Sequence, residues 1–420
     1  MGQFFVFGSM AKLLVSLLLW FLVSLPSPVQ GEEGSAYENP FPLLPGLEPS
    51  VEFWKLVFTR YSTSELIFHD LLEPTKIYKV LKAGEDNTAR RLIEEEREKI
   101  QSAYGLKADE KRVRVQRGLK ERFASGLQLS RKHLEQMQRI FREEGVPVEL
   151  TLLPLVESSF NIHARSRAGA LGLWQFMTAT GKQFLRISSV VDERKDPLES
   201  TRAAARFLKR NYDLLGNWPL AITAYNHGRE GMLRAVAEVG SKDLMEIIRR
   251  YQSPAFGFAS KNFYAEFLAA VEVAGKGEEF FPNLEYHRPF PLEELEVEQP
   301  TSIAALLKST DIPRSEFLDW NPALNPKISD LPIGYRVKVP PEKLELFLVA
   351  YQQIIGQVKR SARAVREISG PWTRHRVAPG ETLSQIAKHY RLSIHEIQRA
   401  NRLASAHLIA AGQDLKIPKR

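Results

Sequence analysis

Cysteine is absent from the 420 residues of the chain. Without a thiol there is no disulfide, no thiolate nucleophile, no thiolate metal site and no cysteine to carry a lipid anchor. Other signatures are missing as well. No set of His, Asp and Glu has the spacing of metal ligands, and neither a Gly-x-Ser-x-Gly elbow nor a phosphate-binding loop occurs. We therefore expect an activity that uses no metal and no other cofactor.

No series of aromatic residues alternates with the basic residues near the end of the chain. The formal net charge is +8, and the segment from His375 to Arg420 carries eight Lys or Arg against three Asp or Glu. Such a basic segment suits an acidic polymer, for example nucleic acid, anionic lipid or a bacterial cell wall. Aromatic platforms would favour nucleic acid, so we expect no nucleic-acid partner.

The first 31 residues are typical of an export signal. Lys12 precedes an apolar run, Leu13 to Leu25, which is shorter than a comfortable membrane span. Pro26 and a small-residue cleavage site ending at Gly31 follow. We expect residues 1–31 to be a signal peptide that exports the protein to the periplasm or cell envelope. The alternative is an uncleaved segment that associates the protein with the membrane.

The rest of the chain divides into several regions, consistent with about two to four domains for this length. Phe53, Trp54, Val57 and Phe58 have helical spacing and a charged helix follows, so 32–117 is predicted to be a helical region with a linker. Residues 118–277 keep the helical period and show no strand-like alternation. This block is predicted to be nearly all-α.

Two related units follow a Pro-rich boundary, at 299–341 and 373–419. Each has helices, of which the last ends in an asparagine (Asn321 and Asn401), then a glycine turn and a final strand. Self-similarity at a spacing of about 80 residues indicates an internal repeat. A helical spacer, 342–372, is predicted between the two units.

Polar residues interrupt the apolar helical stretches at three places: Glu157–Phe160, Gly172–Met177 and Ala224–Gly228. Glu157 ends an apolar segment, and desolvation would raise its pKa and let it serve as a general acid. The plainer interpretation leaves Glu157 on the solvent side of its helix. For the aromatic residues of the second cluster the plainer interpretation is core packing.

These clusters, with Asn161, Ser166 and Gly169-Ala170 between them, resemble the soluble-lytic-transglycosylase catalytic domain, in the branch of the membrane-bound lytic murein transglycosylase D type. That branch pairs the domain with C-terminal LysM modules, and residues 377–418 resemble a LysM module. The resemblance implies a mainly α fold: a lysozyme-like helical catalytic domain followed by small α+β (βααβ) LysM-type modules. The first unit lacks the Gly-Glu-Thr-Leu segment and resembles a degenerate module.

The resemblance also implies roles for matched residues. Glu157 would be the catalytic residue, acting first as acid and then as base. The implied substrate-binding residues are Ser166, Gln175, Met177, Tyr225 and Asn226. Tyr225 would orient Glu157, and Gln175 would contact an acetamido sugar. The implied glycan-binding residues of the LysM module are Pro379, Gly380, Glu381, Thr382, Leu408 and Ile409. Two family positions differ, because Ala259 and Phe263 stand where many members have Glu and Tyr.

The predicted function is that of a peptidoglycan lytic transglycosylase. It would cleave the β-1,4 bond between N-acetylmuramic acid and N-acetylglucosamine and form a 1,6-anhydro end, with peptidoglycan glycan strands as its partner. Two alternatives remain: a muramidase that hydrolyses the same bond with water, and a non-catalytic protein that only binds peptidoglycan.

Overall fold

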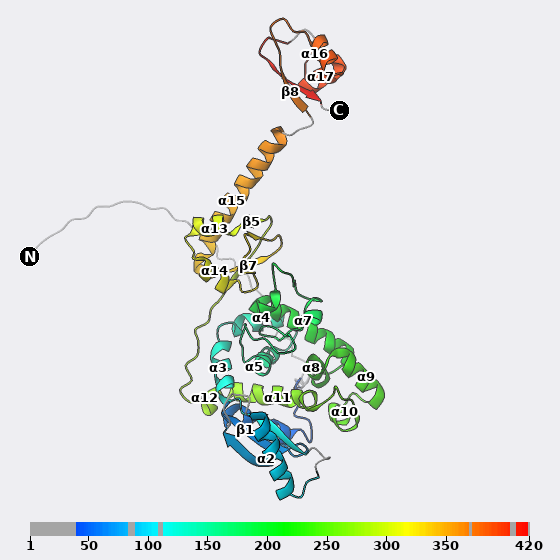
Figure 1. Cartoon of the computed structure of the whole chain (residues 1–420), viewed down its shortest axis with the longest axis vertical. Coiled ribbons are helices and arrows are strands. Elements are labelled where there is room, and N and C mark those ends of the chain that lie inside the picture. Colours follow the sequence, from blue (N-terminus) through cyan, green and yellow to red (C-terminus); the bar gives the residue numbers. More distant parts are fainter. Residues whose placement is uncertain (1–38, 83–88, 108–111, 369–371, 404–408, 419–420) are drawn as a thin grey trace, which may run out of the picture. The chain divides into compact units, whose positions relative to one another are not determined.

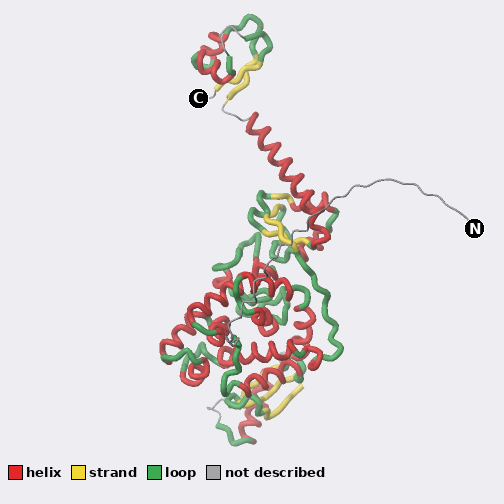
Figure 2. Tube along the Cα trace, turned by 180° about the vertical axis from the view of Figure 1, so that it is seen from behind, coloured by secondary structure: helices red, strands yellow, loops and turns green. Residues whose placement is uncertain are grey.

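The computed structural model describes residues 39–82, 89–107, 112–368, 372–403 and 409–418. The predicted signal peptide, 1–31, lies outside these ranges. Over the described part of the chain, none of the helices combines the length and apolar character needed to cross a membrane. Figure 2 shows helices as the main element, with the strands in small separate groups.

The N-terminal region begins as predicted and then departs from the prediction. Helix α1 (Glu48–Thr59) buries Phe53, Trp54, Val57 and Phe58. A three-stranded antiparallel sheet of order β2-β1-β3 follows, so a purely helical region for 32–117 is wrong. The elements are β1 (Glu65–Asp70), β2 (Ile77–Lys82), α2 (Ala89–Ala103) and β3 (Val113–Arg117).

Burial on both faces explains why β1 is hard to recognise in the sequence. Leu66 and Phe68 pack with Ile100 of α2 on one side, whereas Ile67 joins the main core on the other. A strand covered on both faces reads as a continuous apolar run and lacks the alternation typical of a half-exposed strand. The sequence pattern therefore did not show that α1 ends at Thr59 and that a strand follows.

Residues 118–277 form the helical block, and the prediction of a nearly all-α domain is confirmed. This range is described without a gap, and it contains only isolated bridges in place of strands. The helices of the block are α3 (Lys120–Ser130), α4 (Leu134–Glu143), η2 (Val148–Leu152), α5 (Leu153–Glu157), α6 (Thr178–Gly181), η3 (Glu193–Lys195), α7 (Pro197–Leu215), α8 (Trp218–His227), α9 (Arg229–Val239), α10 (Leu244–Arg250), α11 (Phe258–Gly275) and, at its edge, α12 (Gly277–Phe280).

Local sequence signals set the ends of the longer helices. Asp196 caps α7 by accepting hydrogen bonds from the N–H groups of its first turn. Gly216 ends the same helix at φ +86°, a conformation that glycine adopts without a steric penalty. Asn217 then caps α8. The longer helices of the block surround the short α5 (Figure 1), whose Leu153 and Leu155 are buried.

The first unit is larger than the range predicted for it. Strand β4 pairs antiparallel with β7, so the unit starts before residue 299. Half of the predicted spacer also belongs to it, because Phe347, Tyr351 and Ile355 are buried in its core. Its elements are β4 (Glu293–Glu296), β5 (Thr301–Ser302), α13 (Ile303–Thr310), α14 (Arg314–Trp320), β6 (Asp330–Leu331), β7 (Arg336–Val339) and α15 (Pro341–Ile368).

A buried ionic cluster fixes the first unit to the helical block. The ammonium of Lys338, on β7, is fully buried and lies 2.8 Å from Asp196 Oδ2 and 3.2 Å from Glu199 Oε1. It is 3.5 Å from Glu294, which also bonds Arg202. Apolar residues of the block share the core of the unit, among them Ile140, Val191 and Leu198. Because a buried charge needs its partners, the two parts form one structural body.

The C-terminal module has the predicted βααβ order and a core of its own. Its elements are β8 (Trp372–Arg376), α16 (Leu383–His389), α17 (Ile394–Asn401) and β9 (Asp414–Pro418), with the two strands antiparallel. Its core includes Ile386, Ile397 and Leu415. The predicted fold class, a helical domain followed by small α+β modules, is thus confirmed.

Candidate functional site

Glu157 is the last residue of α5, and the chain reverses immediately after it. Ser159 and Phe160 have positive φ angles of 52° and 56°. Non-glycine residues in this conformation cost about 1–2 kcal/mol each. Two contacts offset this strain: the Phe160 ring is buried, and Ser158 Oγ donates to the carbonyl of Leu173 at 2.7 Å. The turn therefore ties the end of α5 to the loop that contains the second polar cluster.

The environment of Glu157 disfavours its charged form. Its side chain is partly buried, and among the described residues none donates a hydrogen bond to its carboxylate. Burial raises the pKa of Glu157 from 4.5 to about 8. An ionised carboxylate would be poorly solvated there, so the protonated form prevails at neutral pH. The direction of this shift agrees with the one expected from its apolar segment.

Tyr225, on α8, lies close to Glu157 but has another hydrogen-bond partner. Its hydroxyl donates to the carbonyl of Trp174 at 2.8 Å. Burial and the charge of Glu157 raise the pKa of Tyr225. A phenol has one proton to donate, so Tyr225 can orient Glu157 only by accepting from the protonated carboxyl. Within the described ranges no such bond is formed, and this role of Tyr225 stays a prediction.

The loop before α6 presents Gln175. Its backbone has a positive φ of 49°, and its Nε2 donates to the carbonyls of Ala164 and Gly172 at 3.1 and 2.8 Å. These bonds fix the amide and leave Oε1 to accept from a ligand. Gly172, at φ +80°, packs so closely that a Cβ would lie 1.8 Å from the carbonyl oxygen of Arg194. Only glycine fits there.

Arg194, on η3, supports this loop, and sequence reasoning missed it. It is buried, pairs with Asp192 at 2.8 Å, and donates to the carbonyl of Phe176 and to Thr178 Oγ1. Its guanidinium thus holds the segment that carries Gln175. Because Arg194 lies 19 residues beyond Gln175, no local motif signals this contact.

Of the other predicted groove residues, Ser166 and Met177 lie on the loops and Asn226 lies on α8, and the three do not form one cluster. Ser166 Oγ accepts from the N–H of Ala170 at 2.9 Å, which shapes the loop. Met177 is 44% exposed at the start of α6. Asn226 is exposed and accepts from Ser260 Oγ at 3.1 Å. Their contacts with substrate stay predictions. Trp174 and Phe176 are buried in the core, as their plainer interpretation predicts.

Glu266, on α11, is a second carboxyl group, close enough to Glu157 to be influenced by its charge. Burial, together with the charge of Glu157, raises the pKa of Glu266 to about 8, while Arg114 opposes this. Phe258, Asn262 and Glu266 are four residues apart and share one face of α11. The guanidinium of Arg114, on β3, lies 3.8 Å from the centre of the Phe258 ring. Because Arg114 belongs to β3, the N-terminal sheet thus reaches the site. The signal for Glu266 in the sequence was a polar residue at helical spacing on a largely apolar helix.

In the C-terminal module, the predicted binding loop is well defined. Gly380 has φ +81°, and the carboxylate of Glu381 accepts from the N–H of Ala378 at 2.9 Å and pairs with His375 at 2.8 Å. Thr382 caps α16. Pro379 and Gly380 are exposed, whereas Ile409 packs partly against the core. Leu408 lies outside the described residues. No group of three or more His, Asp or Glu that could hold a metal occurs in the part of the chain that is described.

Two protein families match parts of the chain. The family model of the Transglycosylase SLT domain matches residues 138–248, and that of the LysM domain matches residues 375–418. The first match contains Glu157, Gln175 and Tyr225. The chain therefore contains an SLT transglycosylase domain of lysozyme-like fold, followed by a LysM domain.

Similar proteins cover parts of the chain. Membrane-bound lytic murein transglycosylase D of Escherichia coli (strain K12) is 25% identical over 287 residues, which is 66% of this chain and 61% of that protein. A putative tributyltin chloride resistance protein of Alteromonas sp. (strain M-1) is 41% identical over 104 residues, 24% of this chain and 49% of that protein. The chain thus spans less than two thirds of the length of either relative.

Two solved structures are also similar in part. The lytic transglycosylase Slt of Pseudomonas aeruginosa, solved as an inactive mutant, aligns with a TM-score of 0.30 and 20% identity over 37% of this chain and 25% of that one. The 70 kDa soluble lytic transglycosylase of Escherichia coli aligns with a TM-score of 0.28 and 19% identity over 36% of this chain and 26% of that one.

Proposed function

We propose that the protein is a peptidoglycan lytic transglycosylase. It cleaves the β-1,4 bond between N-acetylmuramic acid and N-acetylglucosamine and leaves a 1,6-anhydro end on the muramic acid. The observation that carries this proposal is Glu157, a carboxyl group with a pKa of about 8 within the matched SLT domain. The similarity to a protein named as a murein transglycosylase supports the same substrate class.

Glu157 acts first as the acid. Protonated at neutral pH, it gives its proton to the glycosidic oxygen, and an oxocarbenium-like state develops at the muramic acid. The sugar's own acetamido group assists as positive charge develops. Gln175 Oε1, held in place by the two bonds that its Nε2 donates, accepts from the acetamido N–H.

The same carboxyl then acts as the base. Once it has lost its proton, Glu157 takes the proton of the C6 hydroxyl, whose oxygen closes the anhydro ring. Because that hydroxyl belongs to the bound sugar, the attack has the rate advantage of proximity and needs no water. In the described part of the chain no hydrogen bond stabilises the carboxylate, so the ionised group is a comparatively strong base.

The LysM domain would hold the enzyme on its polymer. Exposed Pro379 and Gly380 form part of the proposed glycan-binding surface, with Glu381 and Thr382 shaping the loop beneath it. The N-terminal segment would export the protein to the periplasm or cell envelope, or keep it at the membrane if uncleaved. The net charge of +8 favours an acidic wall.

Hydrolysis is the second candidate, and Glu266 favours it. Many glycosidases pair two carboxyl groups, one as acid and the other as base or nucleophile. Glu266, on α11, is close enough to Glu157 to interact with its charge. If Glu266 activates water, the product carries a reducing end and is one water heavier than the anhydro product.

Mass spectrometry of the products, with Glu157→Gln as the test variant, distinguishes these functions. Wild-type protein incubated with purified peptidoglycan should release anhydro-muropeptides, and Glu157→Gln should release almost none while still sedimenting with the polymer. The matched control is Glu149→Gln, an exposed carboxyl on η2. If Glu157→Gln released as many anhydro-muropeptides as the wild type, the assignment would be overturned. If the wild-type products carried reducing ends, hydrolysis would be established.

A further inference from the structure

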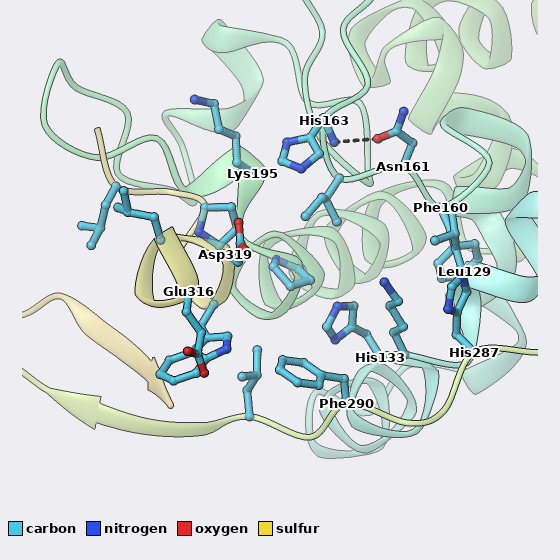
Figure 3. Close-up of a pocket in the computed structure, with 18 of the residues that line it drawn as sticks. Leu129, His133, Phe160, Asn161, His163, Lys195, His287, Phe290, Glu316 and Asp319 are labelled. Atoms are coloured by element: carbon cyan, nitrogen blue, oxygen red, sulfur yellow. Dashed lines mark hydrogen bonds between the residues drawn. The ribbon is translucent and has the colours of Figure 1, made fainter. Parts of the chain in front are cut away.

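A cavity of about 1010 Å³ opens where the helical block meets the first unit (Figure 3). We call it the seam pocket. Its lining comes from the end of α3 and the turn before α4, from the loop after Glu157, from the chain between α12 and β4, and from α14 with the loop that follows. Neither Glu157 nor Gln175 nor Tyr225 lines it, so it is distinct from the catalytic motifs.

The walls of the seam pocket are fixed relative to one another. The N–H of Phe290 donates to the carbonyl of Lys132 at 3.0 Å, and that of His287 donates to Gln128 at 3.3 Å. On the other side, the N–H of Asp192 donates to Ala323 at 2.8 Å. With the ionic cluster around Lys338, these bonds make the pocket part of the folded structure.

The seam pocket is lined by residues that follow Glu157 closely in the chain. Phe160, Asn161 and His163, which line it, follow Glu157 within six residues. A second hollow of about 550 Å³ contains the predicted groove residue Met177 and shares Leu171 and Lys195 with the seam pocket. The pocket is therefore next to the proposed groove, beyond Leu171 and Lys195.

The charges in the pocket suit a ligand with several carboxylates and an amine. Lys132, Lys195 and Arg288 line it, and none of the three forms an ion pair in the described ranges. Glu316 and Asp319 lie together on the side of the first unit (Figure 3). Unpaired cations fix carboxylates by charge-assisted hydrogen bonds, and the two acidic groups can receive an ammonium.

The lining between these charges is largely apolar or uncharged. Phe160 and Leu318 contribute apolar surface, and Phe290 is 38% exposed. Burial lowers the pKa of His133 to about 4, so this ring is neutral at physiological pH. An extended chain with small apolar groups between its charges would thus find complementary surface.

We propose that the seam pocket binds the stem peptide of the substrate, the short peptide that carries several carboxylates and a free amine. This inference rests on the proposed function, because each N-acetylmuramic acid bears its peptide on the ring whose bond is broken. The peptide must therefore leave the groove close to Glu157, and residues that closely follow Glu157 line the pocket. Peptide-bearing strands are then better substrates than stripped strands.

Calorimetric titration of the free stem peptide into the full chain carrying Glu157→Gln tests the pocket without turnover. We expect binding that weakens about tenfold or more when Lys132 and Arg288 are both replaced by Ala, through loss of two charge-assisted contacts. Arg288→Lys should retain most of the affinity. Lys308→Ala, an exposed lysine of α13 away from the pocket, is the matched control. Absence of binding, or equal loss in the control, overturns the inference.

Steady-state kinetics on two substrates provide a second test of the inference. In an otherwise wild-type chain, the Lys132/Arg288 double variant should lose about tenfold in kcat/KM on peptide-bearing strands and nothing on strands stripped of peptide by an amidase. Equal losses on both substrates would mean that the pocket serves the glycan, which refutes the proposal. If the peptide binds but wild-type protein forms no anhydro product, the proposed function fails and the peptide site stands.

Discussion

The ionisation of Glu157 should set the alkaline limit of the reaction. With a pKa of about 8, this carboxyl keeps its proton in about nine of ten molecules at pH 7, whereas a carboxyl with the ordinary value of 4.5 would keep it in about three of a thousand. The buried environment therefore supplies about 300 times more of the acid form. We expect kcat/KM to be nearly constant up to pH 7 and to fall about tenfold per unit above pH 8.

Glu266 lets the cause of this limit be tested. The charge of Glu157 raises the pKa of Glu266, whereas burial alone raises the pKa of Glu157, so Glu266→Gln should leave the alkaline limit near pH 8. The assay is the initial rate of anhydro-product formation from soluble glycan strands between pH 5 and 10 at constant ionic strength. Glu149→Gln is the control, with an unchanged profile expected. Wild-type activity that already falls above pH 5, or a limit that moves by a pH unit in Glu266→Gln, would refute the reasoning.

Four further predictions concern stability and binding. The folded protein holds the Glu157 proton more tightly than the unfolded chain does, because burial raises the pKa of this group. The stability that this proton contributes is therefore lost as pH rises from 4.5 to about 8. Glu157→Gln should raise the melting temperature at pH 8 but not at pH 4. Gly172→Ala should unfold in far less denaturant than Gly169→Ala, because both positions have positive φ but only the first Cβ meets backbone. Lys338→Met should lower the free energy of unfolding by about 3–5 kcal/mol in urea titrations, since it leaves buried carboxylates unpaired; an unchanged midpoint would contradict this. Deleting 373–420 should weaken cosedimentation with peptidoglycan and spare activity on short soluble glycans; unchanged cosedimentation would remove the LysM domain from targeting.

The sequence predicted the features that depend on local pattern. Helical periodicity located the block around Glu157, and the apolar run before this residue pointed to its raised pKa. Strand β1 was missed because it is buried on both faces, which removes the alternation that marks a strand. Half of the predicted spacer proved to be core, since Phe347 and Tyr351 of α15 pack on the first unit.

Contacts between distant positions could not be predicted in this way. Lys338 and Asp196 are 142 residues apart, and neither has a local motif that signals an ion pair. Glu266 gave a weak signal through its helical spacing with Phe258, but only the packing of α11 shows that it lies close enough to Glu157 to be influenced by its charge. The seam pocket combines segments from four parts of the chain, so no single stretch indicates it.

The ionic cluster around Lys338 decides where the chain can be cut. A fragment ending at residue 277, the boundary suggested by the motifs, would keep Asp196 and Glu199 without the ammonium that neutralises them. It would also expose Ile140 and Leu198, which are now covered by the first unit. The smallest catalytic fragment suited to expression and crystallisation should therefore begin near Phe41 and extend past Ile355, and only the C-terminal LysM domain is separable.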